Sequence, residues 1–311
     1  MKPKVYVIVG PTASGKTALS IALAKHIDGE IISADSIQIY KGLDIGSAKP
    51  TMAEREGIAH HMLDVVEISC ATFSVAEYKT MAMHAVEDIL SRNKVPIVAG
   101  GSGLYINALT CPLEFTSIAG DATLRRELHA QEEASPGSLY KMLLEVDAAR
   151  AAQIHPNDRK RLVRALEIYR LSGEKPSHFG LNFTQGSGEE MPYTYEIIGI
   201  SMPREQLYER INLRVDEMLK NGLLEETERI YASGISLDLP ALQGLGYKQL
   251  LSYWRGEVTL EDAIENVKRE TRRFAKRQMT WFLRDKRIRW IEVHEFPNMD
   301  ELISDIIKED R

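Results

Sequence analysis

The chain has 311 residues, of which 44% are hydrophobic and 27% are charged, and its formal net charge is −6. These proportions are typical of a soluble globular protein. No apolar run approaches the roughly 20 residues of a membrane span, so we expect no membrane partner. Cys70 and Cys111 are the only cysteines, and their spacing fits no metal site. A reduced, cytoplasmic protein without disulfides or zinc is the simplest interpretation.

The N-terminal region contains the motif around which the chain is organised. An apolar run over 4–9 enters a loop of pattern G-x-x-x-x-G-K-T, and helical spacing follows over 18–26. In such a loop the backbone N–H groups surround phosphate oxygens, Lys16 adds a positive charge and Thr17 offers its hydroxyl to Mg²⁺. A fortuitous glycine-rich turn is the alternative. The predicted phosphate-binding residues are Gly10, Pro11, Thr12, Ala13, Ser14, Gly15, Lys16 and Thr17.

A second apolar strand is expected over 30–33 and leads into Asp35. An acidic residue at the carboxyl end of a core strand faces the ligand crevice of an open α/β sheet. Three roles fit this position: a magnesium ligand, a general base, or a turn residue whose side chain caps its own loop. The pattern leaves all three open.

The following segment supplies further core elements. A helix is predicted over 74–91 and a third strand over 95–99. The glycine-rich stretch 100–105 then either borders the crevice or forms a simple tight turn. His60 and His61 are adjacent and cannot face one metal from a regular element, so a structural or hydrogen-bonding role is expected.

The sequence pattern changes near residue 117, where charged helices are expected in place of alternating strands and helices. Helices are expected over 121–134 and 138–154 and again after 158, followed by a glycine-rich stretch that ends near 192. We therefore predict an α/β fold: a P-loop NTPase-like parallel sheet flanked by helices, with an inserted all-helical lobe and a C-terminal helical region. The core is assigned to 1–116 and 193–311, and the insertion to 117–192.

The C-terminal part returns to the core. Its expected elements are strands over 193–201 and 288–293, helices over 204–233 and 260–284, and a glycine-punctuated turn over 243–247. Arg210 and Arg214 fall one turn apart on the same face of the first of these helices.

Basic residues gather between 268 and 289. This segment has ten basic and two acidic residues, a net charge of +8, which leaves −14 for the rest of the chain. A basic stripe on an acidic protein indicates a polyanionic partner, and a solvated helix face is the alternative. A second cluster over 159–164 either contacts phosphates or forms surface salt bridges with Asp158 and Glu167.

The P-loop, the strand-end aspartate and the helical insertion by themselves favour a small-molecule kinase, but such an enzyme does not need a helix of charge +8. Taken together, the motifs resemble the bacterial tRNA dimethylallyltransferases along the whole chain. The residues that carry this resemblance are 10–17, 33–36 with Gln38 and Tyr40, 44–50, 60–64, 100–105, 154–158 with Arg161, 164–167, 244–247 and 275–278.

The resemblance implies transfer of a dimethylallyl group from dimethylallyl diphosphate to N6 of adenosine 37, beside the anticodon of tRNA. The P-loop then holds the diphosphate, and Mg²⁺ is the expected cofactor. The family assigns Asp35 as general base and places Thr12 and Arg214 at the diphosphate and the reacting centre. It also prefers adenosines at tRNA positions 36 to 38. We expect a monomer.

The resemblance also implies which segments contact tRNA. By this correspondence the contacts are Asp35, Ser36, Ile37, Gln38, Ser102, Thr123, Arg159, Lys160, Arg161, Leu162, Val163, Leu242, Gln243, Gly244, Leu245, Gly246 and Tyr247. Ser102 stands where many relatives have threonine, which keeps the hydroxyl.

Three other functions remain open at this point. An adenylate isopentenyltransferase would perform the same chemistry on free AMP or ADP, but that acceptor does not require the basic helix. A small-molecule kinase would transfer a γ-phosphoryl group, and a non-catalytic P-loop RNA-binding protein would have no use for Asp35.

Overall fold

The structure is a computed structural model that describes residues 2–113, 118, 120–179 and 191–308. The chain divides into two compact units, Met1–Pro112 with Gly188–Arg311, and Leu113–Ser187. The sequence pattern predicts these limits at 117 and 192. Residue 117 and positions 180–190 of the glycine-rich stretch lie outside the described residues.

The first unit is built on a six-stranded sheet in which every pairing is parallel. Its strands, in the order β3-β2-β4-β1-β5-β6, are β3 (His60–His61), β2 (Gly29–Ser33), β4 (Val95–Gly100), β1 (Lys4–Val9), β5 (Thr194–Ser201) and β6 (Arg289–Glu292). The predicted α/β parallel sheet is confirmed. The strand order reverses around β1, and in open parallel sheets this is where ligands bind, at the carboxyl ends.

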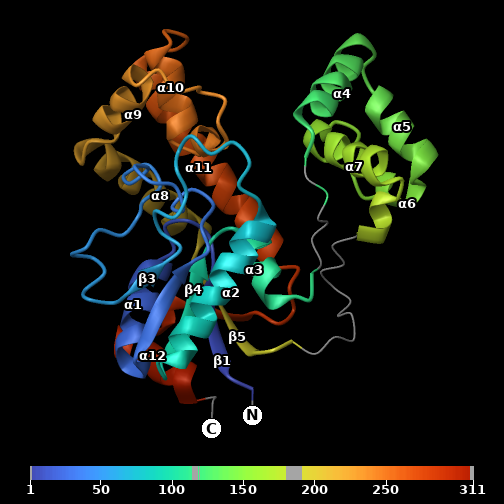
Figure 1. Cartoon of the computed structure of the whole chain (residues 1–311). Coiled ribbons are helices and arrows are strands. Elements are labelled where there is room, and N and C mark those ends of the chain that lie inside the picture. The colour runs from blue at the N-terminus through green and yellow to red at the C-terminus, as the bar shows by residue number, and fades with distance from the viewer. Residues whose placement is uncertain (1, 114–117, 119, 180–190, 309–311) are drawn as a thin grey trace. The chain divides into compact units, whose positions relative to one another are not determined.

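Helices cover both faces of the sheet because successive strand residues point to opposite sides. Val5, Val7 and Val9 of β1 pack toward α2 (Val75–Ser91) and α3 (Gly103–Thr110), whereas Tyr6 and Ile8 pack toward α1 (Lys16–Ile27) and α12 (Met299–Lys308). Figure 1 shows the two layers of helices on either side of the strands. Continuous burial on both faces explains why the strand sequences are apolar throughout.

Four helices form the C-terminal region of this unit: α8 (Arg204–Lys220), α9 (Leu223–Ala232), α10 (Tyr247–Trp254) and α11 (Leu260–Phe282). The prediction of a single helix over 204–233 is wrong, because the helix is interrupted at Asn221 and Gly222. Gly222 adopts φ 100°, a left-handed conformation that helices do not continue through. Two 3₁₀ helices, η2 (Pro240–Gln243) and η3 (Val293–Glu295), complete the unit.

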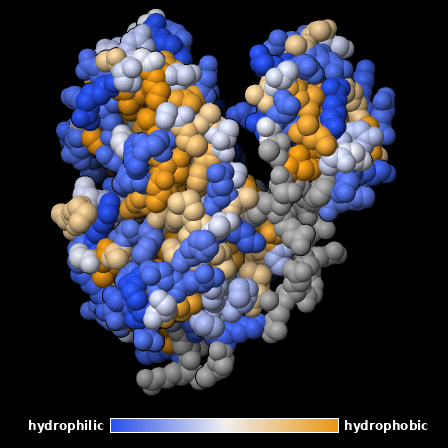
Figure 2. Space-filling model, in the orientation of Figure 1, coloured by the Kyte–Doolittle hydropathy of each residue, from blue (hydrophilic) through white to orange (hydrophobic). Residues whose placement is uncertain are grey.

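A separate apolar core joins the loop after β2 to α9 and α10. Ile39, Leu43, Leu242 and Leu251 are buried in it, with further apolar residues partly exposed around them. On the face of the first unit that Figure 2 shows, hydrophobic residues run along the middle, between hydrophilic margins. This core ties two segments together that are about 200 positions apart in sequence.

The second unit is all-helical in its described part. Its elements are α4 (Ala122–Ala134), α5 (Ser138–Val146), α6 (Ala148–Ala151), α7 (Arg159–Ser172) and η1 (Pro176–Phe179). The single helix expected over 138–154 is wrong. Asp147 ends α5 with a non-helical conformation, and its carboxylate caps α6 by accepting a hydrogen bond from Arg150 N at 3.0 Å.

Candidate active site

Three loops meet at the carboxyl edge of the sheet: the P-loop after β1, the turn after β2 and the glycine-rich turn after β4. With side chains of α8 and α11 they line a cavity of about 100 Å³. Thr12, Asp35 and Arg214, the three residues expected to be catalytic, all border it. Lys16 and Thr17 border it as well, so the predicted phosphate-binding and reacting groups share one space.

The P-loop is folded largely by its own backbone. Gly10 has φ 149°, and a Cβ there would lie 2.7 Å from Ile200 O on β5, so only glycine fits. Lys16 Nζ donates to Gly10 O at 3.0 Å and to Pro11 O at 2.7 Å. These bonds curl the loop around the Lys16 side chain. The backbone N–H groups of the loop then lie at the start of α1, which is an arrangement suited to phosphate oxygens.

Lys16 has unusual electrostatics. Burial, with the Arg214 guanidinium nearby, lowers the pKa of Lys16 to about 7, against an opposing effect of Asp35. Burial also lowers the pKa of Arg214. Two cations thus face one cavity with a single carboxylate, and a bound anion relieves their repulsion.

Asp35 acts as a turn residue in the structure. Its Oδ1 accepts hydrogen bonds from Ile37 N at 2.8 Å and Gln38 N at 3.3 Å. Within the described part of the chain nothing donates to Oδ2. The side chain is therefore fixed through one oxygen, and Asp35 borders the cavity.

Gln278 on α11 connects two of the three loops. It accepts from Thr12 N at 2.8 Å and donates to Gly101 O at 3.0 Å, with 5% of its surface exposed. A Cβ on Gly101 would lie 2.1 Å from Gln278 Nε2, which explains this glycine. Sequence reasoning named Gln278 only as part of a motif, since nothing local indicates that it contacts the P-loop. Ser102 adds a further link, because its Oγ accepts from Ser36 N at 3.0 Å.

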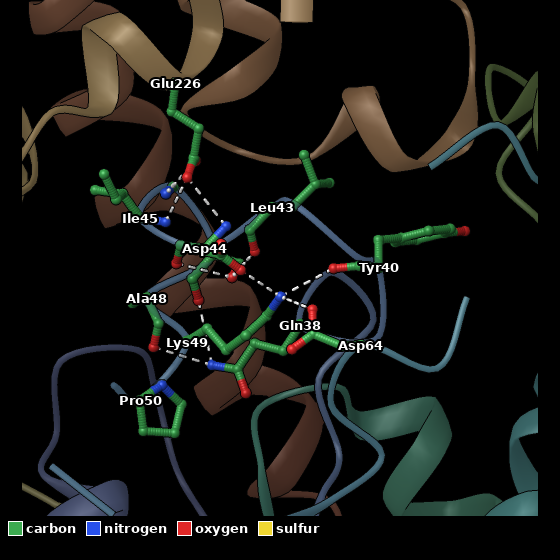
Figure 3. Close-up of polar contacts among 12 residues, drawn as sticks. Gln38, Tyr40, Leu43, Asp44, Ile45, Ala48, Lys49, Pro50, Asp64 and Glu226 are labelled. Carbon is green, nitrogen blue, oxygen red and sulfur yellow. Dashed lines mark hydrogen bonds and ion pairs between the residues drawn. The ribbon is translucent and has the colours of Figure 1, made fainter. Parts of the chain in front are cut away.

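The segment 38–50 forms another wall of the cavity, through Ser47, Ala48 and Pro50. Lys49 belongs to the same segment and is buried. It donates to Tyr40 O at 2.9 Å, Asp44 Oδ1 at 2.7 Å and Asp64 Oδ1 at 2.5 Å. Figure 3 shows these contacts converging on one ammonium group.

His61 has the hydrogen-bonding role that was expected for the adjacent pair His60 and His61. Its Nε2 lies 2.8 Å from Glu30 Oε2.

A larger cavity, of about 810 Å³, lies on the outer side of the P-loop. It shares Lys16, Thr17 and Arg214 with the smaller cavity, whereas Arg210 borders only the larger one. The two arginines that the sequence places on one helix face are therefore not equivalent, and only Arg214 reaches the inner cavity.

The segments expected to contact tRNA contain both buried and exposed side chains. Leu162, Val163, Leu242 and Tyr247 are buried. Among the others, Ser36, Thr123, Arg159, Lys160, Arg161 and Gln243 are exposed. The buried side chains are therefore poorly placed for direct contact, and the assignment of these residues to tRNA stays a prediction.

The basic residues are partly used inside the protein. Six of the ten between 268 and 289 pair with described carboxylates: Lys268, Arg269, Arg272, Arg273, Arg287 and Arg289. Lys276, Arg277, Arg284 and Lys286 form no ion pair with any described residue. The solvated-face interpretation thus accounts for part of the stripe and leaves four cations for a partner.

The cluster on α7 divides in the same way. Arg164 Nη1 donates to the buried Glu167 at 2.6 Å, so the expected salt bridge exists. Asp158 instead caps the helix by accepting from Arg161 N at 3.2 Å. The side chains of Arg159, Lys160 and Arg161 remain exposed at the helix N-terminus.

None of the described helices combines the length and apolar character needed to cross a bilayer. Nowhere in the described parts do three or more His, Cys, Asp or Glu side chains gather as metal ligands.

Comparison with known proteins identifies the family. A family model described as IPP transferase matches residues 38–286. A tRNA dimethylallyltransferase from Acetivibrio thermocellus is 47% identical over 97% of this chain and 96% of its own length. Another, from Pelotomaculum thermopropionicum, is 44% identical over 99% of this chain and 96% of its own.

Solved structures agree with this result. A tRNA isopentenylpyrophosphate transferase from Bacillus halodurans has a TM-score of 0.74 at 40% identity, covering 99% of this chain and 96% of its own. A eukaryotic dimethylallyltransferase described as acting on tRNA has a TM-score of 0.78 at 31% identity, over 99% and 80% of the two chains. These matches span both units, and the resemblance inferred from the motifs is confirmed: the chain belongs to the IPP transferase family.

Proposed function

We propose that this protein transfers a dimethylallyl group from dimethylallyl diphosphate to N6 of adenosine 37 in tRNA and releases diphosphate. One observation carries the proposal: Asp35, whose Oδ2 accepts no hydrogen bond from a described residue, borders the same small cavity as the P-loop lysine and Arg214. A proton acceptor and an anion site in one space suit a reaction that removes a proton from one partner and diphosphate from the other.

The chemistry requires both parts. The N6 lone pair of adenine is delocalised into the ring and is a poor nucleophile, so the reaction depends on a stabilised leaving group. The N6–carbon bond forms while the allylic carbon–oxygen bond breaks, and the diphosphate takes the electron pair. Asp35 accepts the N6 proton, a role that typically contributes roughly 10²–10⁴-fold. Lys16, Arg214, the P-loop N–H groups and Thr12 stabilise the charge that develops on the diphosphate.

Magnesium fits the P-loop through few protein ligands. The exposed Thr17, at the start of α1, offers one hydroxyl oxygen, and no acidic cluster accompanies it among the described residues. That donor set suits Mg²⁺, which commonly takes most of its ligands from substrate phosphates and water. When bound, the ion would neutralise charge on the leaving diphosphate.

The tRNA substrate must present its adenine unstacked, which costs least in a single-stranded loop. Lys276 and Arg277 of α11, Arg284 and Lys286 after it, and the exposed basic residues of α7 would bind its backbone. We expect the second unit to contribute to tRNA binding, the preferred tRNAs to have adenosines at positions 36 to 38, and the protein to act as a monomer in the cytoplasm.

The test uses radiolabelled dimethylallyl diphosphate and Mg²⁺ in parallel incubations with unmodified tRNA and with AMP. Label in the tRNA alone is the expected result, and a transcript with guanosine at position 37 should remain unlabelled. Label in AMP alone would identify an adenylate isopentenyltransferase. Label in neither, together with γ-phosphoryl transfer from ATP, would replace the proposal with a kinase.

A further inference from the structure

Glu226 on α9 is a buried carboxylate outside the residues discussed for catalysis, with 3% of its surface exposed. Its Oε2 accepts from Asp44 N at 3.1 Å and Ile45 N at 2.9 Å, and its Oε1 accepts from Gly46 N at 3.1 Å. Figure 3 shows this carboxylate above the turn, with three successive N–H groups directed at it. No described cation pairs with it, so these backbone dipoles stabilise its charge.

Tyr247 completes the arrangement from α10. Its hydroxyl donates to Glu226 Oε1 at 2.7 Å, and burial together with Glu226 raises its pKa, which keeps it a donor. A Cβ on Gly46 would lie 2.6 Å from Tyr247 Cζ, so the ring packs directly against the turn. The turn 44–46 is therefore fixed to α9 and α10 on its outer side.

The inner side of the same loop orients Gln38. The carbonyl oxygens of Ser47 and Ala48 accept from Gln38 Nε2 at 3.2 and 3.1 Å, and Ser33 Oγ donates to Gln38 Oε1 at 2.9 Å. Both amide hydrogens of Gln38 are thus occupied, and its remaining hydrogen-bonding capacity is as an acceptor. Gln38 borders the small cavity beside Asp35.

We propose that Glu226 is a positioning residue for the acceptor nucleoside: it fixes the turn 44–46, and thereby the two carbonyl groups that orient the Gln38 amide. This inference rests on the proposed function, because the nucleoside is the ligand of that part of the cavity. An acceptor oxygen beside the base suits an exocyclic amino group, which has two N–H donors. Loss of the anchor would leave the phosphate end of the site intact and disturb the nucleoside end.

The decisive variant is Glu226→Gln. In this variant an amide nitrogen replaces one carboxylate oxygen and would face backbone N–H donors of the turn 44–46. Part of the attraction between the side chain and the turn thus becomes repulsion. We expect kcat/KM for tRNA to fall on the order of tenfold to a hundredfold, while KM for dimethylallyl diphosphate stays within about twofold. Tyr247→Phe removes one of the four bonds and should shift the same parameter in the same direction by less.

Thr227→Val is the matched control. Thr227 is the next residue on α9, is buried, and accepts a hydrogen bond from Trp254 Nε1 on α10 at 3.0 Å, and it makes no hydrogen bond to the turn 44–46. It should reduce thermal stability without changing KM for tRNA. If Thr227→Val and Glu226→Gln reduce kcat/KM for tRNA equally, Glu226 is only a packing residue.

Hydrogen exchange separates this inference from the proposed function. In Glu226→Gln the amides of 44–46 should exchange faster than in the wild type, while those of β1 stay protected. Faster exchange with unchanged tRNA kinetics would overturn the positioning role. A wild-type protein that labels no tRNA would overturn the proposed function, and the exchange result would still report whether Glu226 holds the turn.

Discussion

The P-loop and the segment 35–50 border one cavity, yet they are stabilised in different ways. The P-loop forms most of its bonds within itself: Ser14 N donates to Pro11 O at 3.3 Å, and Lys16 donates to Gly10 O and Pro11 O. The segment 35–50 also has internal bonds, such as those of Lys49 to Tyr40 O and Asp44 Oδ1, but its turn 44–46 is held by Glu226, which lies 180 to 182 positions away along the chain.

This difference separates the two chemical tasks of the site. The phosphate end needs N–H groups and a cation, which a short glycine-rich motif supplies wherever it follows a strand. The nucleoside end needs side chains held at fixed positions on an irregular loop, and such a loop requires support from packed elements. We therefore expect variants at the two ends to affect different kinetic parameters.

The largest effect is expected at Asp35, which belongs to the nucleoside end. Asp35→Asn keeps the oxygen that accepts from Ile37 N and Gln38 N, but it removes the proposed proton acceptor. We expect kcat to fall roughly 10²–10⁴-fold with little change in thermal stability or in tRNA affinity. Single-turnover label transfer measures this.

Asp35→Ala is the companion variant, because it removes the turn bonds as well and should also lower the unfolding temperature. A kcat for Asp35→Asn within about threefold of the wild type would show that Asp35 is only a turn residue.

At the phosphate end, Arg214→Ala should reduce kcat/KM for dimethylallyl diphosphate by roughly 10²–10³-fold, because it removes one group proposed to stabilise the leaving diphosphate. Arg210→Ala is the matched control, one turn earlier on α8 and bordering only the outer cavity. Steady-state kinetics with varied diphosphate substrate decide the matter, and equal losses in the two variants would contradict the distinction drawn between the arginines.

Gly46→Ala tests the remote support of the segment 35–50. The added Cβ would lie 2.6 Å from the buried Tyr247 ring, so we expect a loss of about 1–3 kcal/mol in the free energy of unfolding. Gly244→Ala is a milder case, since its Cβ would meet the flexible end of Ile37 at 3.0 Å. Urea unfolding compares them, and an equal loss in both variants would mean that the Tyr247 contact is not special.

The smallest effect concerns pH and Lys16, whose pKa is lowered to about 7 by burial and Arg214. Below that pH the free protein already has a protonated lysine. Above it the lysine is neutral, so binding an anion takes up a proton. The affinity for diphosphate should therefore fall as pH rises from 7 to 9, by up to about tenfold per unit.

Lys16→Arg provides the comparison, because arginine stays charged throughout this range. The ionisation of the diphosphate is common to both proteins, so calorimetric titrations should give a steeper slope for the wild type. Identical slopes would exclude a titrating Lys16.

Several features follow from local patterns. The strand–loop–helix around the P-loop, the position of Asp35 and the strands β1, β2 and β4 are all recognisable because their signals are contiguous. The helix interruptions at Asp147 and Gly222 are recognised less easily, because the helical spacing of apolar residues continues across them. A single capping or left-handed residue ends each helix. Partner choice among the basic residues of 268–289 is also not local, because Lys268 of α11 pairs with Asp216 of α8 and Arg289 of β6 pairs with Asp305 of α12.

The parallel α/β class, the phosphate-binding loop, the strand-end aspartate and the family resemblance can all be recognised from the order of the residues alone. Only the tertiary structure showed that Gln278 bridges the P-loop and the second glycine turn, that Arg214 and not Arg210 reaches the inner cavity, and that Glu226 supports the opposite wall. The physical reason is the range of the interactions. Backbone motifs satisfy their own hydrogen bonds within a few residues, whereas a buried polar side chain finds its partners only after distant elements have packed around it.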